Sequence, residues 1–153
     1  MSDASMEAGK ADGAQNPAQN LEAVRQRFAA DRFAVEAAGI TVEEASPRHA
    51  VCSMEIRPVH RNAAGAVMGG AVFTLADFCF AVAANNADTA GATVSLSSSV
   101  TFLSPAKGRR LTAEAVCVKS GRTTCLYTVN VRDELDTKVA FVSITGFRTA
   151  AVF

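Results

Sequence analysis

One stretch of the chain, from Asn62 to Asn85, limits the possible folds more than any other. It begins with polar and glycine-rich positions and continues through about four turns of almost wholly apolar, helix-forming sequence from Ala71 to Ala84. A helix that is apolar all round is normally surrounded by other structure. The sequence therefore predicts a central helix wrapped by the rest of the chain.

Asp77 is the single charge in this apolar run. A carboxylate carried into a protein interior is costly unless it is paired or protonated. Positions three and four apart share a helix face, and those around Asp77 are small or polar: Gly70, Thr74, Ala81 and Asn85. This stripe would let a ligand or another segment approach closely, so Asp77 is a candidate functional residue. Alternatively, Asp77 has a purely structural role and only forms hydrogen bonds with the backbone of a neighbouring strand.

The composition indicates one globular domain without bulk charge. The chain has 153 residues, of which 49% are hydrophobic, and its formal net charge is zero. Nothing in this balance attracts nucleic acid or an anionic membrane. The apolar run is shorter than the ~20 residues that cross a bilayer, and residues 1–20 lack the apolar core of a secretory signal. We therefore expect a cytoplasmic protein that binds neither membranes nor nucleic acid.

The cysteines and histidines do not form a recognisable metal or catalytic motif. The four cysteines lie far apart, without C-x-x-C spacing, at Cys52, Cys79, Cys117 and Cys125. We expect buried reduced thiols, with no bound metal and no disulfide. The two histidines, His49 and His60, are interpreted as loop or surface residues rather than catalytic bases.

Periodicity divides the chain into a tail and one domain. Residues 1–20 show no periodicity and are expected to be a disordered tail, whereas residues 21–153 form a single domain. Helical spacing begins at Leu21 and ends before Gly39. Strand patterns follow at Ile40–Ala45, His49–Ile56, Thr93–Leu103, Arg110–Lys119, Thr123–Arg132 and Val139–Arg148.

Turn signals at residues 104–108, 119–122 and 133–136 predict that the last four strands are antiparallel neighbours. Residues 87–91 are a loop. One apolar helix followed by long antiparallel strands indicates an α+β fold, in which a curved antiparallel sheet wraps around one long central helix. An exposed edge strand of such a sheet favours edge-to-edge pairing of two copies.

The strand predicted at Thr93–Leu103 carries a row of hydroxyl groups. Simple alternation places Ser95, Ser97, Ser99 and Thr101 on one face, and Val94, Leu96, Ser98, Val100 and Phe102 on the other. The hydroxyl row is either solvated or lines a groove for an extended polar ligand such as an amide-bearing chain.

A carboxylate beside a glycine-rich helix start suits acyl transfer. The free backbone N–H groups of Gly69 and Gly70 point out of the helix N-terminus and could hold a thioester carbonyl and the oxyanion formed on attack. Asp77 would activate a water or attack directly to form an anhydride, and Asn62 would orient the water or the carbonyl. A G-G pair before a helix is more often structural. The sequence contains no G-x-S-x-G, P-loop, G-x-G-x-x-G or H-E-x-x-H motif.

Residues 60–81 read HRNAAGAVMGGAVFTLADFCFA, followed by AAN at 83–85. This run resembles the signature H-x-N-x-x-G-x-x-H-G-G-x-x-F-x-L-A-D-x-A-F of hotdog-fold acyl-CoA thioesterases of the PaaI type, which are linked with phenylacetate breakdown. The segments VTFLSP at 100–105, LTA at 111–113 and KSGRT at 119–123 resemble the second half of that family. The resemblance covers about Phe28 to Arg148. It implies a hotdog fold and hydrolysis of a small or aromatic acyl-CoA to free acid and coenzyme A.

The same resemblance implies roles for the residues around the helix. Asp77 would be the nucleophile or general base, at a dimer interface where the thioester is bound mainly by the other subunit. Met68 and Gly69 match the positions that hold the thioester carbonyl, and Asn62 lies close by. The protein would be a homo-oligomer, either a dimer or a dimer of dimers (a homotetramer).

Coenzyme A is part of the implied substrate, so no separate cofactor is expected. By similarity its phosphates and adenine lie near Lys119, Gly121, Arg122 and Thr123, and its pantetheine passes along Ser98 and Ser99. Ser95 matches a serine that assists the attacking water in some relatives.

Met68 is a departure from the family pattern, which has a histidine at this position. A thioether cannot donate a hydrogen bond to a carbonyl, and loss of such a donor can cost a few kcal/mol in the transition state. Met68 could instead widen the acyl pocket or make it more apolar. Two alternatives stay open: a non-catalytic acyl-CoA-binding sensor, and a hotdog hydratase or dehydratase, which would pair an aspartate with a histidine.

Overall fold

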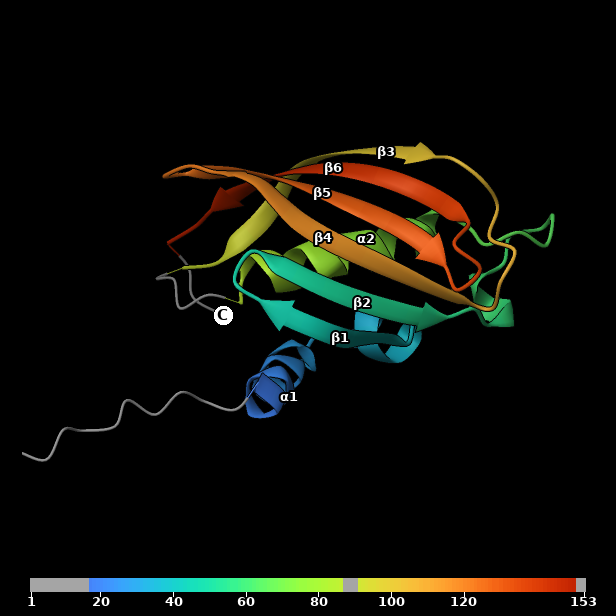
Figure 1. Cartoon of the computed structure of the whole chain (residues 1–153), viewed down its shortest axis with the longest axis horizontal. Helices are drawn as coiled ribbons and strands as arrows, with labels where there is room; N and C mark the ends of the chain where they lie inside the picture. The colour runs from blue at the N-terminus through green and yellow to red at the C-terminus, as the bar shows by residue number, and fades with distance from the viewer. Residues whose placement is uncertain (1–16, 87–90, 151–153) are drawn as a thin grey trace, which may run out of the picture.

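The computed structural model describes residues 17–86 and 91–150, and in it a six-stranded antiparallel sheet curves around one long helix (Figure 1). The elements in chain order are α1 (Pro17–Phe28), a π-helical turn (Phe33–Ala37), β1 (Ile40–Ser46), β2 (His49–Glu55), a 3-10 turn (Pro58–His60), α2 (Gly69–Ala84), β3 (Thr93–Phe102), β4 (Arg110–Ser120), β5 (Thr124–Asp133) and β6 (Lys138–Arg148). The α+β hotdog architecture predicted from the sequence is confirmed. No helix of the described segments is long and apolar enough to cross a membrane.

The N-terminal helix starts earlier and ends earlier than predicted. Helix α1 begins at Pro17, inside the expected tail, whose residues 1–16 lie outside the described residues. It stops at Phe28, and a separate π-helical turn follows. Asp31 explains the break, because its Oδ1 accepts a hydrogen bond from Ala34 N (3.1 Å) and thereby offers the backbone a partner outside the continuing helix.

The strand order is β1-β2-β4-β5-β6-β3, so one of the three predicted hairpins is wrong. β4 pairs with β5 and β5 with β6, as expected, but β3 pairs with β6 rather than β4. The connection after β3 passes the ends of β6 and β5 instead of turning back. It is held there by Leu103 N, which donates to Val139 O (2.9 Å), and by the carboxylate of Asp133, which accepts from Lys107 N and Gly108 N. β3 is therefore an edge strand.

A bulge in β3 also changes the predicted faces of that strand. Ser95 pairs with Gly146 and Ser97 with Thr145, so Leu96 is an extra residue without a cross-strand partner. One extra residue reverses the alternation that follows it. Ser95 consequently shares a face with Ser98, Val100 and Phe102, while Ser97, Ser99 and Thr101 share the opposite face with Val94.

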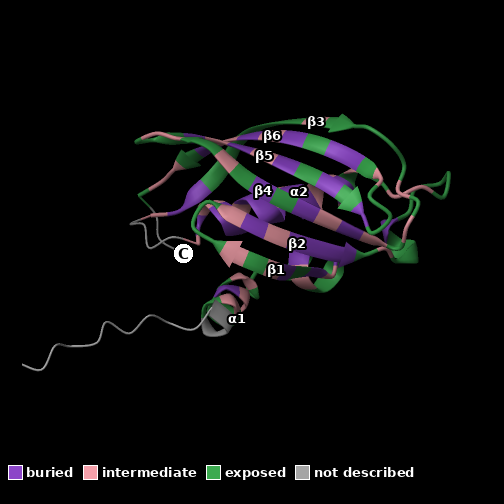
Figure 2. Ribbon diagram, in the orientation of Figure 1, coloured by how far each residue is buried: buried purple, intermediate pink, exposed green. Residues whose placement is uncertain are grey.

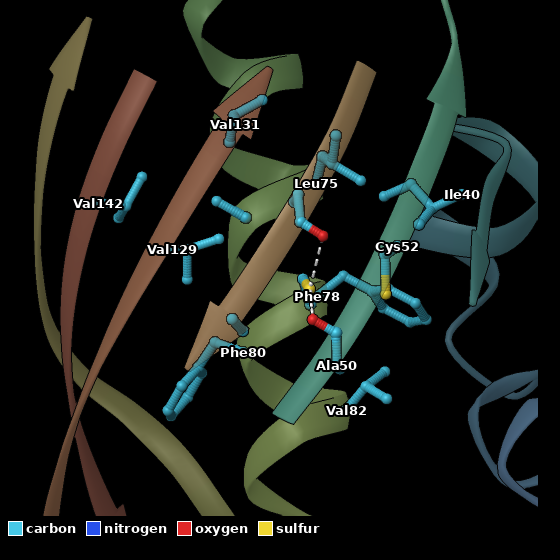
Figure 3. Packing of buried hydrophobic residues seen from close by; sticks show 14 of the residues in the cluster. Ile40, Ala50, Cys52, Leu75, Phe78, Phe80, Val82, Val129, Val131 and Val142 are labelled. Carbon is cyan, nitrogen blue, oxygen red and sulfur yellow. Dashed lines mark hydrogen bonds between the residues drawn. The ribbon is translucent and has the colours of Figure 1, made fainter. Parts of the chain in front are cut away.

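Helix α2 is buried on one side only. Its core side includes Leu75, Phe80 and Val82, which pack against the sheet (Figures 2 and 3). Cys79 Sγ lies on the same side and contacts the carbonyl oxygens of Ala50 (3.4 Å) and Ala113 (3.3 Å). The stripe of Gly70, Thr74, Asp77 and Ala81 stays exposed or half-buried. The sheet therefore wraps the helix partly and leaves the small, polar stripe open.

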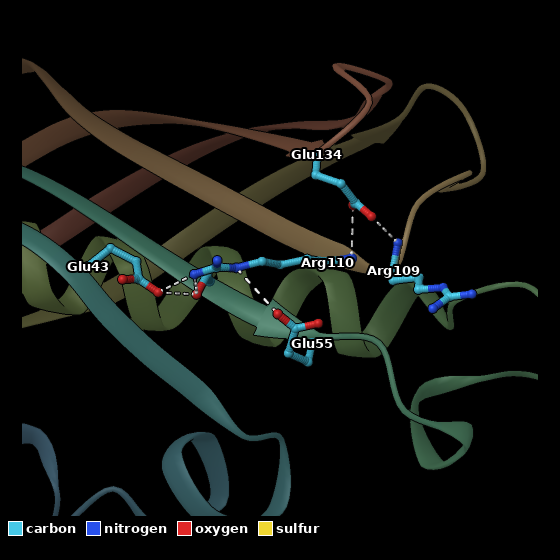
Figure 4. A network of polar contacts seen from close by, with 6 residues as sticks. Glu43, Glu55, Arg109, Arg110 and Glu134 are labelled. Atoms are coloured by element: carbon cyan, nitrogen blue, oxygen red, sulfur yellow. Dashed lines mark hydrogen bonds and ion pairs between the residues drawn. The ribbon is translucent and has the colours of Figure 1, made fainter.

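A polar network ties β1, β2 and β4 together on the face of the sheet away from α2 (Figure 4). The Arg110 guanidinium contacts Glu43, Ser53 and Glu55. The carboxylate of Glu134 accepts hydrogen bonds from the backbone N–H groups of Arg109 and Arg110. These contacts fix the register of the strands that carry the core, at a distance from α2's open stripe.

Candidate active site

Asp77 lies midway along α2, on the open stripe. Its Oδ1 atom is buried and has no hydrogen-bond partner among the described residues. Burial raises the pKa of Asp77 above its ordinary value, the Ser95 hydroxyl opposes that rise, and the Asp31 carboxylate adds to it. No backbone N–H of the described chain reaches Oδ1, so this oxygen is free to accept a proton.

Ser95 lies beside Asp77, on the side of β3 that faces α2. Its cross-strand partner, Gly146, faces α2, since a Cβ placed on Gly146 would lie 2.8 Å from the ring of Phe80. Cross-strand partners point to the same face of a sheet. The bulge at Leu96 thus gives the helix side of β3 a serine near its start and a second serine, Ser98, further along.

Asp77 and Ser95 line one cavity with a volume of about 720 Å³. Its wall is formed by three elements: Arg27, Phe28, Ala30 and Asp31 from α1 and the residues after it, Asp77, Phe80, Ala81 and Asn85 from α2, and Thr93, Val94 and Ser95 from β3. Most of this lining is apolar, with a few polar groups, as in small-molecule sites.

Asn85 holds the elements of this cavity together. Its Nδ2 donates to Ala81 O and Thr93 O (both 2.9 Å), and its Oδ1 accepts from Thr93 N (2.7 Å). The Asn85 carbonyl accepts from the Arg27 guanidinium (2.9 Å). The sequence placed Asn85 on the stripe and in the family motif, but nothing in it indicated that this residue clamps α1, α2 and β3.

The start of α2 presents free backbone donors, as predicted. Met68 is the N-cap and makes no side-chain cap, and within the described chain neither Gly69 N–H nor Gly70 N–H has an acceptor. A Cβ at Gly69 would lie 2.8 Å from the ring of Phe102. The Met68 side chain is 54% exposed and its Cε lies over Gly70.

A short loop positions this helix start. Asn62 Oδ1 accepts hydrogen bonds from Ala64 N (3.0 Å) and Ala66 N (3.1 Å), so its side-chain oxygen shapes the loop. The carbonyl of His60 accepts from Met68 N (2.8 Å). His60 is buried rather than on the surface, and its Nδ1 accepts from Arg57 N. Burial lowers the pKa of His60, so its ring is a neutral support for the loop.

Asp77 and Gly69 do not meet within one chain. Asp77 lies eight positions after Gly69 on the helix, a rise of about 12 Å. Gly69 lines a different cavity of about 400 Å³, together with Phe102 and Pro105. A single thioester carbonyl cannot touch both groups of the same chain.

The residues matched to coenzyme A lie on the β4–β5 hairpin and on β3. Lys119, Arg122 and Thr123 are exposed. Gly121 is half-buried, and its carbonyl accepts from the Arg148 guanidinium (2.6 Å), a brace that the sequence did not reveal. Ser98 and Ser99 are both exposed but point to opposite faces of β3.

A family model described as the thioesterase superfamily matches residues 64–140, about half of the chain. Among curated proteins, mouse acyl-coenzyme A thioesterase 13 is 28% identical over 79% of this chain and 88% of its own length. A putative esterase of Archaeoglobus fulgidus is 32% identical over 65% of this chain, which spans 64% of that esterase.

Solved structures agree with this family. A single-residue mutant of the phenylacetic acid degradation protein PaaI from Thermus thermophilus has a TM-score of 0.69 and 34% identity, covering 75% of this chain and 97% of that one. A Streptococcus mutans protein solved with acetyl CoA bound has a TM-score of 0.67 and 29% identity, covering 72% of this chain and 88% of that one.

The fold and the family match define a hotdog-fold protein of the thioester-hydrolase class. The chain belongs to the thioesterase superfamily, and the PaaI-type resemblance predicted from its sequence is confirmed.

Proposed function

We propose that this protein hydrolyses small or aromatic acyl-CoA thioesters to free acid and coenzyme A. The observation that carries the proposal is Asp77, which lines a ligand-sized cavity and has one buried carboxylate oxygen without a partner in the described chain. A carboxylate in this state is a suitable base, because its raised pKa favours proton transfer from water.

In the proposed reaction, Asp77 takes a proton from a water while the water oxygen adds to the thioester carbonyl. The Gly69 N–H stabilises the resulting oxyanion. Collapse of this intermediate breaks the C–S bond, and the coenzyme A thiolate leaves and takes up the proton. Direct attack by Asp77, which forms an anhydride that water then opens, gives the same products.

The active unit is proposed to be a homodimer or a dimer of dimers, because one chain keeps Gly69 and Asp77 apart. The edge strand β3 exposes Val94, Leu96 and Phe102 along an unpaired backbone. Antiparallel pairing of two such edges would place the two α2 helices side by side in opposite directions. The Gly69 end of one helix would then approach Asp77 of the other.

We propose that the phosphates of coenzyme A bind near Lys119, Gly121, Arg122 and Thr123, and that its pantetheine lies along β3. The proposed location of the protein is the cytoplasm. The acetyl CoA bound to the Streptococcus mutans relative supports a ligand of this kind. The hydratase alternative lacks support, since neither histidine lines the Asp77 cavity: His49 pairs with Glu114 on the sheet, and His60 is buried under the loop.

The test is release of free thiol from a panel of short, long, branched and aromatic acyl-CoAs, with the Asp77→Ala protein as the blank. Hydrolysis that is lost in the variant supports the proposal and identifies the acyl class. Binding of the same esters without any thiol release would overturn it in favour of the non-catalytic sensor, the reading that Met68 favours.

A further inference from the structure

Two carboxylates from different elements face the Asp77 cavity. Asp77 comes from α2, and Asp31 comes from the residues between α1 and the π-helical turn. Among the described residues that line the cavity, Arg27 is the single cation, so their two acids and one base sum to a net charge of −1. The other lining residues are uncharged, and Phe28, Phe80 and Val94 among them are apolar.

Asp31 is held in place by the break in the helix. Its Oδ1 accepts from Ala34 N (3.1 Å), its carbonyl accepts from Val35 N (2.9 Å), and its own N–H donates to Phe28 O (3.0 Å). No hydrogen bond of the described chain reaches its second carboxylate oxygen. Its charge acts across the cavity, because it is one of the groups that raise the pKa of Asp77.

Arg27 is not in direct contact with either carboxylate. Its guanidinium donates to the carbonyl of Asn85, at the end of α2, and it forms no ion pair with Asp31 or Asp77 among the described residues. The two carboxylates therefore outnumber the one cation of the described lining, which leaves it with a negative net charge.

We propose that Asp31 is a specificity-determining residue, which makes the cavity accept uncharged acyl groups and exclude acyl groups that end in a carboxylate. The inference rests on the proposed function, in which this cavity holds the acyl group beside Asp77. An acyl carboxylate entering the cavity would meet two like charges, the half-buried Asp77 and the exposed Asp31, and would be repelled by both. An aryl or alkyl group would meet an apolar wall, and a terminal hydroxyl could donate to the free oxygen of Asp31.

The experiment compares three coenzyme A thioesters that share the phenylacetyl skeleton and differ only at ring position 4: phenylacetyl, 4-hydroxyphenylacetyl and 4-carboxyphenylacetyl. We expect wild-type kcat/KM for the carboxylated ester to be at least about tenfold below that for the unsubstituted ester. Asp31→Asn keeps an oxygen for Ala34 N but removes the charge, and it should shrink that ratio to about threefold or less. Glu22→Gln removes a charge from exposed α1 surface outside the cavity and should leave the ratio at its wild-type value.

Two results would overturn the inference: equal wild-type use of the charged and uncharged esters, or a ratio that Asp31→Asn does not change. Preference for the carboxylated ester that disappears in Arg27→Gln would assign the selectivity to Arg27 instead. Dissociation constants of the matching non-hydrolysable thioethers give the same ratio without turnover. If no ester releases thiol, the proposed function fails, but the dissociation constants still test whether Asp31 selects against carboxylated acyl groups.

Discussion

The side chain of Asp77 carries a charge that the surrounding fold compensates only in part. An unpartnered buried carboxylate opposes folding whenever it is ionised, yet the same state makes it a reactive base. Its neighbours explain how it is tolerated: the Ser95 hydroxyl partly offsets the burial, and the open stripe of α2 leaves one side half-exposed. Stability and activity should therefore change in opposite directions when Asp77 is altered.

Asp77→Asn should lower kcat by about 10²- to 10⁴-fold, the usual contribution of a general base, and raise the Tm at pH 7. Because the folded-state pKa lies above the unfolded value, the stability contribution of this group is fully present below the unfolded pKa and is lost as pH rises through the folded pKa. The gain in Tm should thus vanish in acid. Calorimetry at both pH values and thiol-release assays measure the two effects.

Asp136→Asn is the matched control, because Asp136 is an exposed carboxylate paired with Arg132. An Asp77→Asn protein with normal turnover would remove Asp77 from the mechanism. Wild-type kcat/KM should also decline toward low pH, as Asp77 becomes protonated at a pH above the ordinary titration range of an aspartate.

Replacement of Met68 should leave the catalytic activity almost unchanged. Its side chain makes no cap and is largely exposed, so Met68→Ala is expected to change kcat less than about threefold. Met68→His would add a donor at the helix start and should raise kcat, by up to about tenfold if that donor reaches the oxyanion. A large loss in Met68→Ala, measured with the same ester, would show that the thioether itself has a role in binding or catalysis.

At the scale of elements, the sequence predicted what depends on local pattern and missed what depends on tertiary pairing. The six strands and α2 appear at their expected positions because alternation and helical spacing are local signals. The pairing of β3 with β6 is set by contacts between distant segments, such as Leu103 with Val139, which no local pattern records. The bulge at Leu96 likewise leaves no mark on a Ser-rich strand, so simple alternation grouped Ser95 with Ser97 and Ser99 instead of with Ser98.

For the candidate site, too, the sequence indicates the local features and misses the contacts between distant segments. Asp77, Gly69 and Gly70 were found from their residue types and spacing, since a lone acid in an apolar helix and a glycine pair at its start are visible in sequence. The contribution of α1 to the cavity was missed, because Asp31 lies in an ordinary surface-like context and reaches Asp77 only through folding. The clamp at Asn85 was missed for the same reason.

Asn85→Ala should disturb the site as well as the fold. It removes three side-chain hydrogen bonds and leaves Thr93 N without its partner, which should cost about 1–3 kcal/mol of unfolding free energy. Because the clamp sets Ser95 against Asp77, we also expect kcat to fall more than KM rises. Urea unfolding and steady-state kinetics measure the two, and Asn130→Ala, on an exposed position of β5, is the control. Lost stability with unchanged kcat would limit Asn85 to a structural role.

For the whole molecule, the proposed cooperation of Asp77 with the Gly69 donors predicts that each reaction needs two chains. Asp77 and the donors at Gly69 lie about 12 Å apart on a rigid helix, and they line separate cavities. Motion of a loop cannot close this gap. A second copy paired along β3 would supply the missing half to each site, so two sites would form and each would use Asp77 from one chain and Gly69 from the other.

Mixed dimers test this arrangement. Asp77→Asn and Gly69→Pro, which removes the N–H at a helix-start position whose backbone suits proline, should each be inactive as homodimers. Because the added Cβ of Gly69→Pro would meet the Phe102 ring, Gly69→Ala, which adds the same Cβ and keeps the N–H, is its control. In a heterodimer of the two, one site carries both lesions and the other carries neither, so co-expression with two affinity tags should recover about half of the wild-type activity per dimer. Differently tagged copies of Asp77→Asn alone should recover none. If the purified mixed dimer is inactive as well, the two groups do not cooperate across subunits, and Asp77 must act with donors of its own chain.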